Sequence, residues 1–186
     1  TKMAVVDAAA DLADARGREV TLAELASHLG VRAPSLYNHV EGHDGLRHEL
    51  ALRGLREMTR RMGRAAVGKS GDDALMAVAG AYRGFAREHP GLYAVFERAP
   101  AGDDPEISAA GAELVGIVVA VLAGYGLAGN DALHATRGLR SLVHGFVSLE
   151  ALGGFGLPLD VDESFRRLVR TFIAGLRDGE TTARRT

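Results

Sequence analysis

The segment from Thr21 to Val40, TLAELASHLGVRAPSLYNHV, constrains the fold more than any other part of the chain. Thr21 and Glu24 have the spacing of a capping box, in which each side chain bonds a backbone N–H at the start of a helix. Gly30 allows the left-handed turn that ends this helix, and Pro34 is tolerated in the first turn of the next one. The segment therefore predicts two short helices joined by a tight turn.

The second of these helices is predicted to continue to Val40 and to enter a DNA major groove. Leu36 and Val40 are four residues apart and are expected to face inward, with Val31 filling the angle between the helices. The sixteen residues from Leu25 to Val40 contain no carboxylate, which suits a surface that approaches phosphates. The residues that we predict to contact DNA in this segment are Thr21, Arg32, Ala33, Pro34, Ser35, Tyr37, Asn38 and His39.

Three stretches of the first third, AVVDAAADLADARG, TLAELASHLGV and PSLYNHVEGHDGL, resemble the TetR-like family of bacterial transcriptional regulators. LYNHV is similar to the family's leucine-tyrosine-x-histidine-aromatic signature, with Val40 in place of the usual phenylalanine. The resemblance implies an all-α protein, in which a three-helix helix-turn-helix DNA-binding head precedes a helical ligand-binding and dimerisation body. It also implies a phosphate contact at His43, where the family commonly carries a lysine.

Apolar spacing predicts the remaining helices and the division of the chain. A stripe from Ala4 to Ala13 predicts a first helix that ends at Gly17, and the stripe Leu46, Leu50, Leu55, Met58 and Met62 predicts a long helix over about 43–63. Body helices are expected over about 72–88, 90–98, 105–125, 130–152 and 161–177. We expect a DNA-binding domain over 1–45, a linking helix over 46–67 and a ligand-binding and dimerisation domain over 68–186.

The last two body helices carry wide apolar stripes, and the resemblance implies that they pair with their counterparts in a second copy. A homodimer is favoured because a single head contacts too few base pairs to be specific, and two-fold symmetry doubles the site. The alternative is that the same stripes form a purely intramolecular core. The predicted dimer residues are Leu139, Leu142, Phe146, Phe165, Leu168, Phe172 and Ile173.

A small-molecule effector site is expected in the body. LVHGFVSLE, residues 142–150, resembles the histidine-glycine signature of a regulator subgroup whose C-terminal domain is named for tryptophan, histidine and glycine, although this chain has no tryptophan. Aromatic and methionine side chains at helical spacing are first of all core residues, but they can also line an apolar pocket. The predicted lining is Met58, Met62, Tyr82, Phe85, Tyr93, Phe96 and His144, and it indicates an apolar effector.

Several classes of function are not expected. The chain has no cysteine, which excludes disulfides and thiolate chemistry. No uninterrupted apolar run reaches the roughly 18 residues that span a bilayer, so we predict a cytoplasmic protein without a membrane partner. His39 and His43 have a spacing that can hold zinc, but Glu41 and Gly42 interrupt the helix between them. We therefore expect no metal, no cofactor and no enzymatic activity.

Two functions remain open at the level of sequence. The first is a ligand-responsive DNA-binding regulator, a repressor that a small apolar effector releases from its double-stranded DNA operator. The second is a helical protein-interaction module in which the helix-turn-helix serves only for packing. Alanine substitutions at Arg32 and Tyr37 separate them, because only the first function requires these side chains for DNA binding.

Overall fold

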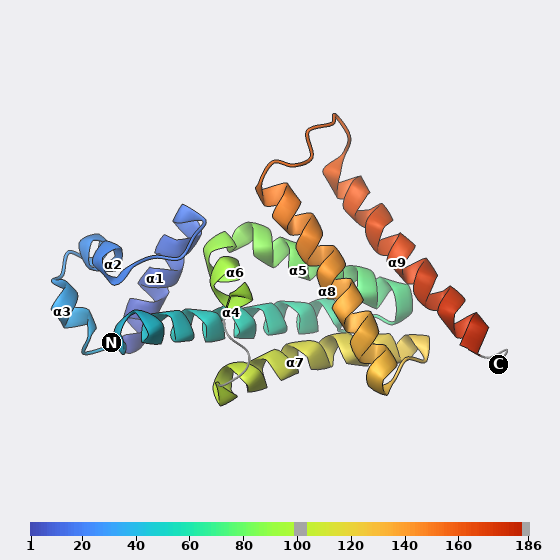
Figure 1. The fold of residues 1–186 in the computed structure, drawn as a ribbon, viewed down its shortest axis with the longest axis horizontal. Coiled ribbons are helices and arrows are strands. Elements are labelled where there is room, and N and C mark those ends of the chain that lie inside the picture. The colour runs from blue at the N-terminus through green and yellow to red at the C-terminus, as the bar shows by residue number, and fades with distance from the viewer. Residues whose placement is uncertain (99–103, 184–186) are drawn as a thin grey trace. The chain divides into compact units, whose positions relative to one another are not determined.

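The computed structural model describes residues 1–98 and 104–183, with side chains to residue 177. Every regular element in this part of the chain is a helix (Figure 1). The all-α prediction is confirmed. The elements are α1 (Lys2–Arg16), α2 (Leu22–Leu29), α3 (Ala33–Leu36), α4 (Gly42–Ala66), α5 (Gly71–Glu88), α6 (Pro90–Glu97), α7 (Pro105–Leu122), the 3-10 turn η1 (Ala123–Tyr125), α8 (Gly129–Ala151) and α9 (Val161–Ala183).

The chain folds as two compact units. The first unit contains Thr1–Met58 and Glu88–Ala112, so α6 belongs with the three short N-terminal helices and with the first part of α4. The second unit contains Thr59–Arg87 and Glu113–Thr186. The domain limits expected from the sequence, at residues 45 and 67, differ from these boundaries: residue 45 lies inside α4 and residue 67 lies just beyond its end. The expected functional division of the chain therefore stays a prediction.

Apolar side chains on α1 and α4 form much of the core of the first unit. Val5, Ala9, Leu12 and Ala13 of α1 are buried as the stripe predicts, but Ala4 is exposed and Ala8 is half-buried. Gly17 ends the helix with a φ of 62°. The predicted apolar residues of α4 are all buried, although the helix itself runs further, to Ala66. Periodicity therefore identified most of the buried face of α1 and correctly predicted burial of the α4 stripe.

A backbone contact joins α6 to the end of α1. A side chain at Gly91 would place its Cβ 2.1 Å from the backbone carbon of Ala13, so only glycine fits this approach. The carboxylate of Asp14 accepts hydrogen bonds from the backbone N–H of Leu92 at 3.0 Å and lies 2.7 Å from Nδ1 of His89. A side chain of α1 thus supplies the acceptor that the N-terminal N–H groups of α6 require.

In the second unit, a buried arginine of α5 connects the helical pair α8 and α9. The guanidinium of Arg83 donates to both carboxylate oxygens of Glu150, at 2.9 and 2.6 Å, and to Asp162 at 2.7 Å. It also lies over the rings of Phe146 and Phe165, 5.3 and 4.9 Å from their centroids. Because each charge has a partner, the cost of burying this arginine is offset.

The helix over Pro105–Tyr125 bears on the expectation that the protein has no membrane partner. By length and composition, this helix is able to cross a membrane, and it is the one such helix among the described residues. The sequence expectation considered apolar runs, which Glu113 interrupts, whereas an average over 18 residues tolerates such a charged residue. A single helix of this kind is weak evidence for a membrane protein.

Two local expectations also differ from the structure. Val31 leaves 44% of its surface exposed and does not fill the angle between α2 and α3. The last helix extends to Ala183, beyond the expected end at residue 177, so Gly179 does not end it.

We expect Gly91→Ala to destabilise the protein by about 1–3 kcal/mol or more, because the added methyl group overlaps the backbone of α1. Gly80→Ala is the matched control, since Gly80 is exposed inside α5 and its added Cβ meets nothing within 4 Å. The control should stabilise the protein by about 0.5–1 kcal/mol. Urea unfolding followed by circular dichroism measures both changes, and equal stability of the two variants would contradict the close contact.

Candidate nucleic-acid interface

The predicted capping box is present at the start of α2. The Thr21 side chain accepts from the backbone N–H of Glu24 at 3.2 Å, and the backbone N–H of Thr21 donates to Glu24 Oε2 at 2.8 Å. Gly30 ends α2 with a φ of 66°, in the left-handed region where glycine is favoured. The first helix and the turn of the predicted helix-turn-helix are therefore built as the sequence indicates.

Two arginines that the sequence analysis did not single out reinforce this cap. Arg16 forms an ion pair with Glu24, and Arg18 approaches the same carboxylate oxygen to 2.6 Å. The hydrogen bond from Arg18, followed by that from the Thr21 backbone, lowers the pKa of Glu24 to about 2. Glu24 is therefore ionised at neutral pH and holds the start of α2 against the end of α1.

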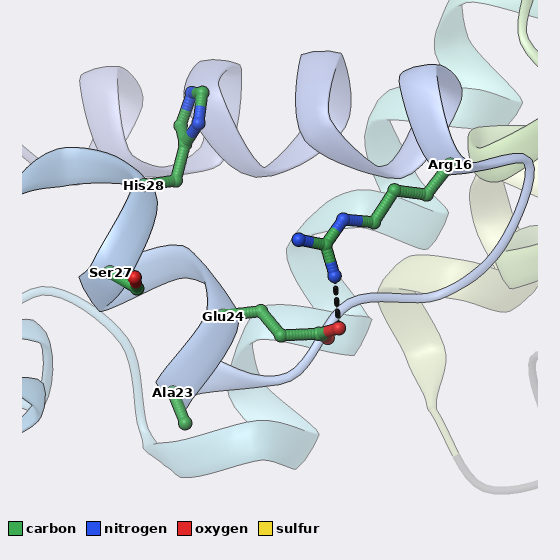
Figure 2. A pocket seen from close by; sticks show the side chains of 5 residues that line it. All are labelled: Arg16, Ala23, Glu24, Ser27 and His28. Atoms are coloured by element: carbon green, nitrogen blue, oxygen red, sulfur yellow. Dashed lines mark hydrogen bonds and ion pairs between the residues drawn. The ribbon is translucent and has the colours of Figure 1, made fainter.

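An open groove of about 400 Å³ lies between α1 and α2 (Figure 2). Figure 2 shows the Arg16 guanidinium directed at Glu24, with His28 on the other side of the groove. Its lining is Arg16, Ala23, Glu24, Ser27 and His28. Because the Arg16 cation is already paired, this groove has no free positive charge from that residue for an anionic ligand.

The second helix of the motif is shorter than predicted. Its α-helical part, α3, ends at Leu36, and the chain continues as a hydrogen-bonded turn in which the N–H groups of His39 and Val40 bond the Leu36 carbonyl. Arg32 at the N-cap provides no side-chain cap, which leaves this start weaker than that of α2. One isolated helical turn is unstable, so burial of Leu36 and Val40 must hold the segment in place.

The structure leaves the predicted DNA contacts accessible. Leu36 and Val40 are buried, whereas the Tyr37 side chain is 61% exposed. Ala33 is half-buried, and the other predicted contacts are exposed, namely Thr21, Arg32, Pro34, Ser35, Asn38, His39 and His43. We call residues 32–39 the recognition segment. Its role in DNA binding stays a prediction, but its exposure and its lack of carboxylates are what that role requires.

His43, in the first turn of α4, has a neighbour that the sequence did not predict. Its Nε2 lies 3.1 Å from the carboxylate of Glu19, in the loop between α1 and α2. Arg47 approaches the same carboxylate oxygen to 3.7 Å and also donates to the backbone carbonyl of Arg98 at 3.2 Å. A protonated His43 therefore has an acidic protein partner in addition to any DNA phosphate.

The predicted effector residues are distributed over both units. Met58, Tyr93 and Phe96 belong to the first unit, whereas Met62, Tyr82, Phe85 and His144 belong to the second. Tyr93 and His144 are half-buried and the other five are buried. Tyr93 contacts Phe96 edge to face at 5.4 Å between ring centroids, and the Arg61 guanidinium lies 5.7 Å above the Phe85 ring. Their role in ligand binding stays a prediction.

The predicted dimer residues divide into two groups. Leu139, Phe146, Phe165 and Ile173 are buried within a single chain, so they have little surface left for a partner. Leu142, Leu168 and Phe172 are half-buried and retain accessible surface. Glycine at position 138 permits close packing of α8 and α9, because a Cβ there would lie 3.2 Å from the Phe172 ring.

A helix-turn-helix with an exposed, carboxylate-free recognition segment, followed by a helical body, defines a class: the DNA-binding transcriptional regulators. Comparison with known proteins identifies the family. Residues 75–172 match the family model described as the tetracyclin repressor-like C-terminal domain. The chain belongs to the TetR family of transcriptional regulators, whose members bind DNA and small molecules and act as dimers.

Two bacterial relatives support this assignment. The uncharacterized HTH-type transcriptional regulator Rv0681 of Mycobacterium tuberculosis is 38% identical over 178 residues, which cover 95% of this chain and 81% of the relative. The uncharacterized HTH-type transcriptional regulator YobS of Bacillus subtilis is 41% identical over 179 residues, covering 95% and 92%. The chain is therefore a DNA-binding regulator rather than an enzyme or a protein-interaction module.

Solved structures show the same fold. A single-substitution variant of TetR from Acinetobacter baumannii AYE, crystallised in complex with minocycline, superposes with a TM-score of 0.71 at 20% identity. The match covers 97% of this chain and 98% of that one. PfmR from Thermus thermophilus, a TetR family regulator, gives a TM-score of 0.69 at 17% identity over 91% and 97% of the two chains.

We expect acid to weaken the first unit through Glu24. Its pKa is lowered in the folded state, so ionised Glu24 contributes stability above its unfolded pKa near 4.3, and this contribution is lost as the pH falls toward about 2. Glu24→Gln should be less stable than wild type at pH 7 and should lose less stability between pH 5 and 2. Urea unfolding at each pH measures this, with Glu113→Gln, an exposed carboxylate of α7, as the control. Parallel pH profiles for E24Q and wild type would contradict the assignment.

We expect DNA affinity to increase as the pH falls from 8 to 6, because a cationic imidazole at position 43 would attract phosphate. His43→Gln should remove this increase, and Glu19→Gln should enlarge it by removing the competing carboxylate. In binding isotherms at several salt concentrations, the slope of log affinity against log salt concentration should be steeper by about one at pH 6 than at pH 8 for wild type and E19Q, but not for H43Q. A flat profile for wild type would remove His43 from the predicted contacts.

Proposed function

We propose that this chain is a ligand-responsive repressor that binds its operator as a homodimer and is released by a small apolar effector. The observation that carries the proposal is the recognition segment, which is exposed and free of carboxylates on a family member's helix-turn-helix. Such a regulator works where bacterial DNA lies, in the cytoplasm. Direct contacts from Arg32 and Tyr37 would supply specificity, and phosphate contacts would fix the orientation of the head.

The surface of α8 and α9 supports the homodimer. Each helix carries an uncharged stripe with the spacing i, i+4, i+7 and i+11, the last member on α8 being Leu152 at its C-cap. Such a spacing is typical of helices that pack against one another. All eight residues are exposed or half-buried, and a Cβ added at Gly145 or Gly175 would meet nothing within 4 Å. We call this surface the α8–α9 face; it consists of Ser141, Gly145, Ser148 and Leu152 with Ser164, Leu168, Thr171 and Gly175.

The contacts of α6 provide a route from the body to the DNA-binding head. One residue, His89, separates α5 in the second unit from α6 in the first, and its ring lies 2.7 Å from Asp14 of α1. On α4, a Cβ at Gly54 would lie 3.1 Å from the Phe96 ring, so α6 is close to α4 as well. A ligand that displaces the end of α5 would therefore act on α1 and α4 together. An effector can shift a protein between two conformations only if it binds one of them more tightly than the other.

Buried side chains of the second unit support an apolar effector. Met62, Tyr82 and Phe85 are buried there, and the lining of small-molecule sites is predominantly apolar and aromatic. The paired charges of this unit, Arg83 with Glu150 and Asp162, are bonded to one another and lie over Phe146 and Phe165. They are thus engaged in connecting helices.

The test is binding of fluorescent DNA from the region flanking the gene, compared with a scrambled duplex of equal length. Arg32→Ala and Tyr37→Ala should each weaken specific binding by about tenfold, because both remove a side chain from a base-reading surface without changing the core. Arg64→Ala, an exposed arginine near the end of α4, should bind as wild type does. Wild-type affinity in both R32A and Y37A would show that the contacts are wrongly assigned.

The same assay tests the effector. Apolar small molecules should release wild-type protein from the operator, and charged analogues of equal size should not. Release by the charged analogues alone would contradict the apolar class while leaving DNA binding intact.

A further inference from the structure

The last turn of α8 and the loop that leads to α9 expose an unusual number of leucines. Leu149, Leu152, Leu157 and Leu159 leave 51%, 84%, 75% and 71% of their surfaces exposed. These four residues lie within an eleven-residue stretch, whereas single exposed apolar residues are ordinary on protein surfaces. Figure 1 shows the loop extending past the last turn of α8 before the chain returns to α9. A cluster of this kind marks an interaction surface.

Aromatic and backbone contacts hold the loop in place. The ring of Phe155, in the middle of the loop, lies 4.7 Å from that of Phe146, which in turn lies 5.1 Å from Phe165. The N–H of Gly154 bonds the carbonyl of Leu149 at 2.8 Å, and that of Leu159 bonds the carbonyl of Leu157 at 2.8 Å. The single aromatic side chain of the loop is thus directed inward while the leucines remain at the surface.

Charged residues anchor both ends of the loop. Glu150 before it and Asp162 after it bond the same arginine, Arg83. Asp160 caps α9 by accepting from the backbone N–H groups of Asp162 and Glu163, at 2.8 and 3.3 Å. Residues 151–159 contain no charged side chain. The exposed leucines therefore belong to a fixed, uncharged surface, and a fixed surface loses less entropy when it binds.

The size and position of this surface indicate the partner. The α8–α9 face ends at Leu152, where the loop begins, so the two uncharged surfaces are continuous. A standard interface uses about 20–30 residues on each side, and the eight residues of the α8–α9 face are too few. A two-fold contact pairs a surface with itself, which an uncharged apolar surface permits without charge repulsion.

We propose that the leucines of the α8–α9 loop pack against a second copy of this chain and extend the dimer interface beyond the helices. This inference rests on the homodimer proposed above. The second copy is the occupant because the loop continues the face on which that copy is proposed to bind.

The experiment compares the dimer dissociation constants of the purified full chain by sedimentation velocity over a range of concentrations. Leu157→Asp combined with Leu159→Asp should raise the constant at least tenfold, because four carboxylates would then enter one apolar interface. Leu133→Asp is the matched control: Leu133 is 45% exposed on α8 but lies in line with Arg137 and Arg140, away from the α8–α9 face. It should leave the constant unchanged. Circular dichroism verifies that both variants are folded.

Each outcome is informative. A wild-type dimer that only the double loop variant weakens supports the loop as part of the interface. A double variant that dimerises as tightly as L133D overturns the loop proposal and leaves the homodimer standing. A wild-type chain that stays monomeric at all concentrations overturns the homodimer, and the loop proposal with it. Gly145→Arg places a charge on the α8–α9 face itself. If the interface consists of the helices alone, Gly145→Arg should weaken the dimer and the double loop variant should not.

Discussion

The close approach of α6 to the backbone of α1 is the contact on which the first unit depends. Gly91 makes it possible by having no side chain, and Asp14 makes it specific by accepting the N–H of Leu92. Through this contact, α6 folds with the DNA-binding helices although its neighbour in sequence, α5, folds with the other unit. The chain therefore passes between the two units near His89, and also within α4 and within α7.

Local signals in the sequence predicted much of the DNA-binding head. The Thr21–Glu24 capping box, the helix-ending Gly17 and Gly30, and the inward-facing Leu36 and Val40 all follow from interactions between residues close in the chain. Helix ends and apolar stripes are governed by neighbours three or four residues away, which a sequence displays directly. The exposure of the recognition segment follows from the same periodicity.

Interactions between distant residues were not predictable in this way. Nothing near Asp14 indicates its bond to His89, and nothing near Arg83 indicates its bonds to Glu150 and Asp162. The sequence also suggested that Leu139 and Phe146 were available to a partner, because periodicity locates an apolar face without showing what covers it. The neighbour of His43 was not predictable either, because Glu19 is 24 residues away in the sequence and comes close to His43 only in the folded chain.

The buried Arg83 also determines the register of the two C-terminal helices. Leucines can slide past one another with little change in energy, but a guanidinium that bonds Glu150 through two nitrogens has one favourable geometry. Because Asp162 shares the same cation, α8 and α9 are fixed against rotation and translation at their connected ends. An arginine that contributes little net stability can thus specify which residues of these helices are presented together at the surface.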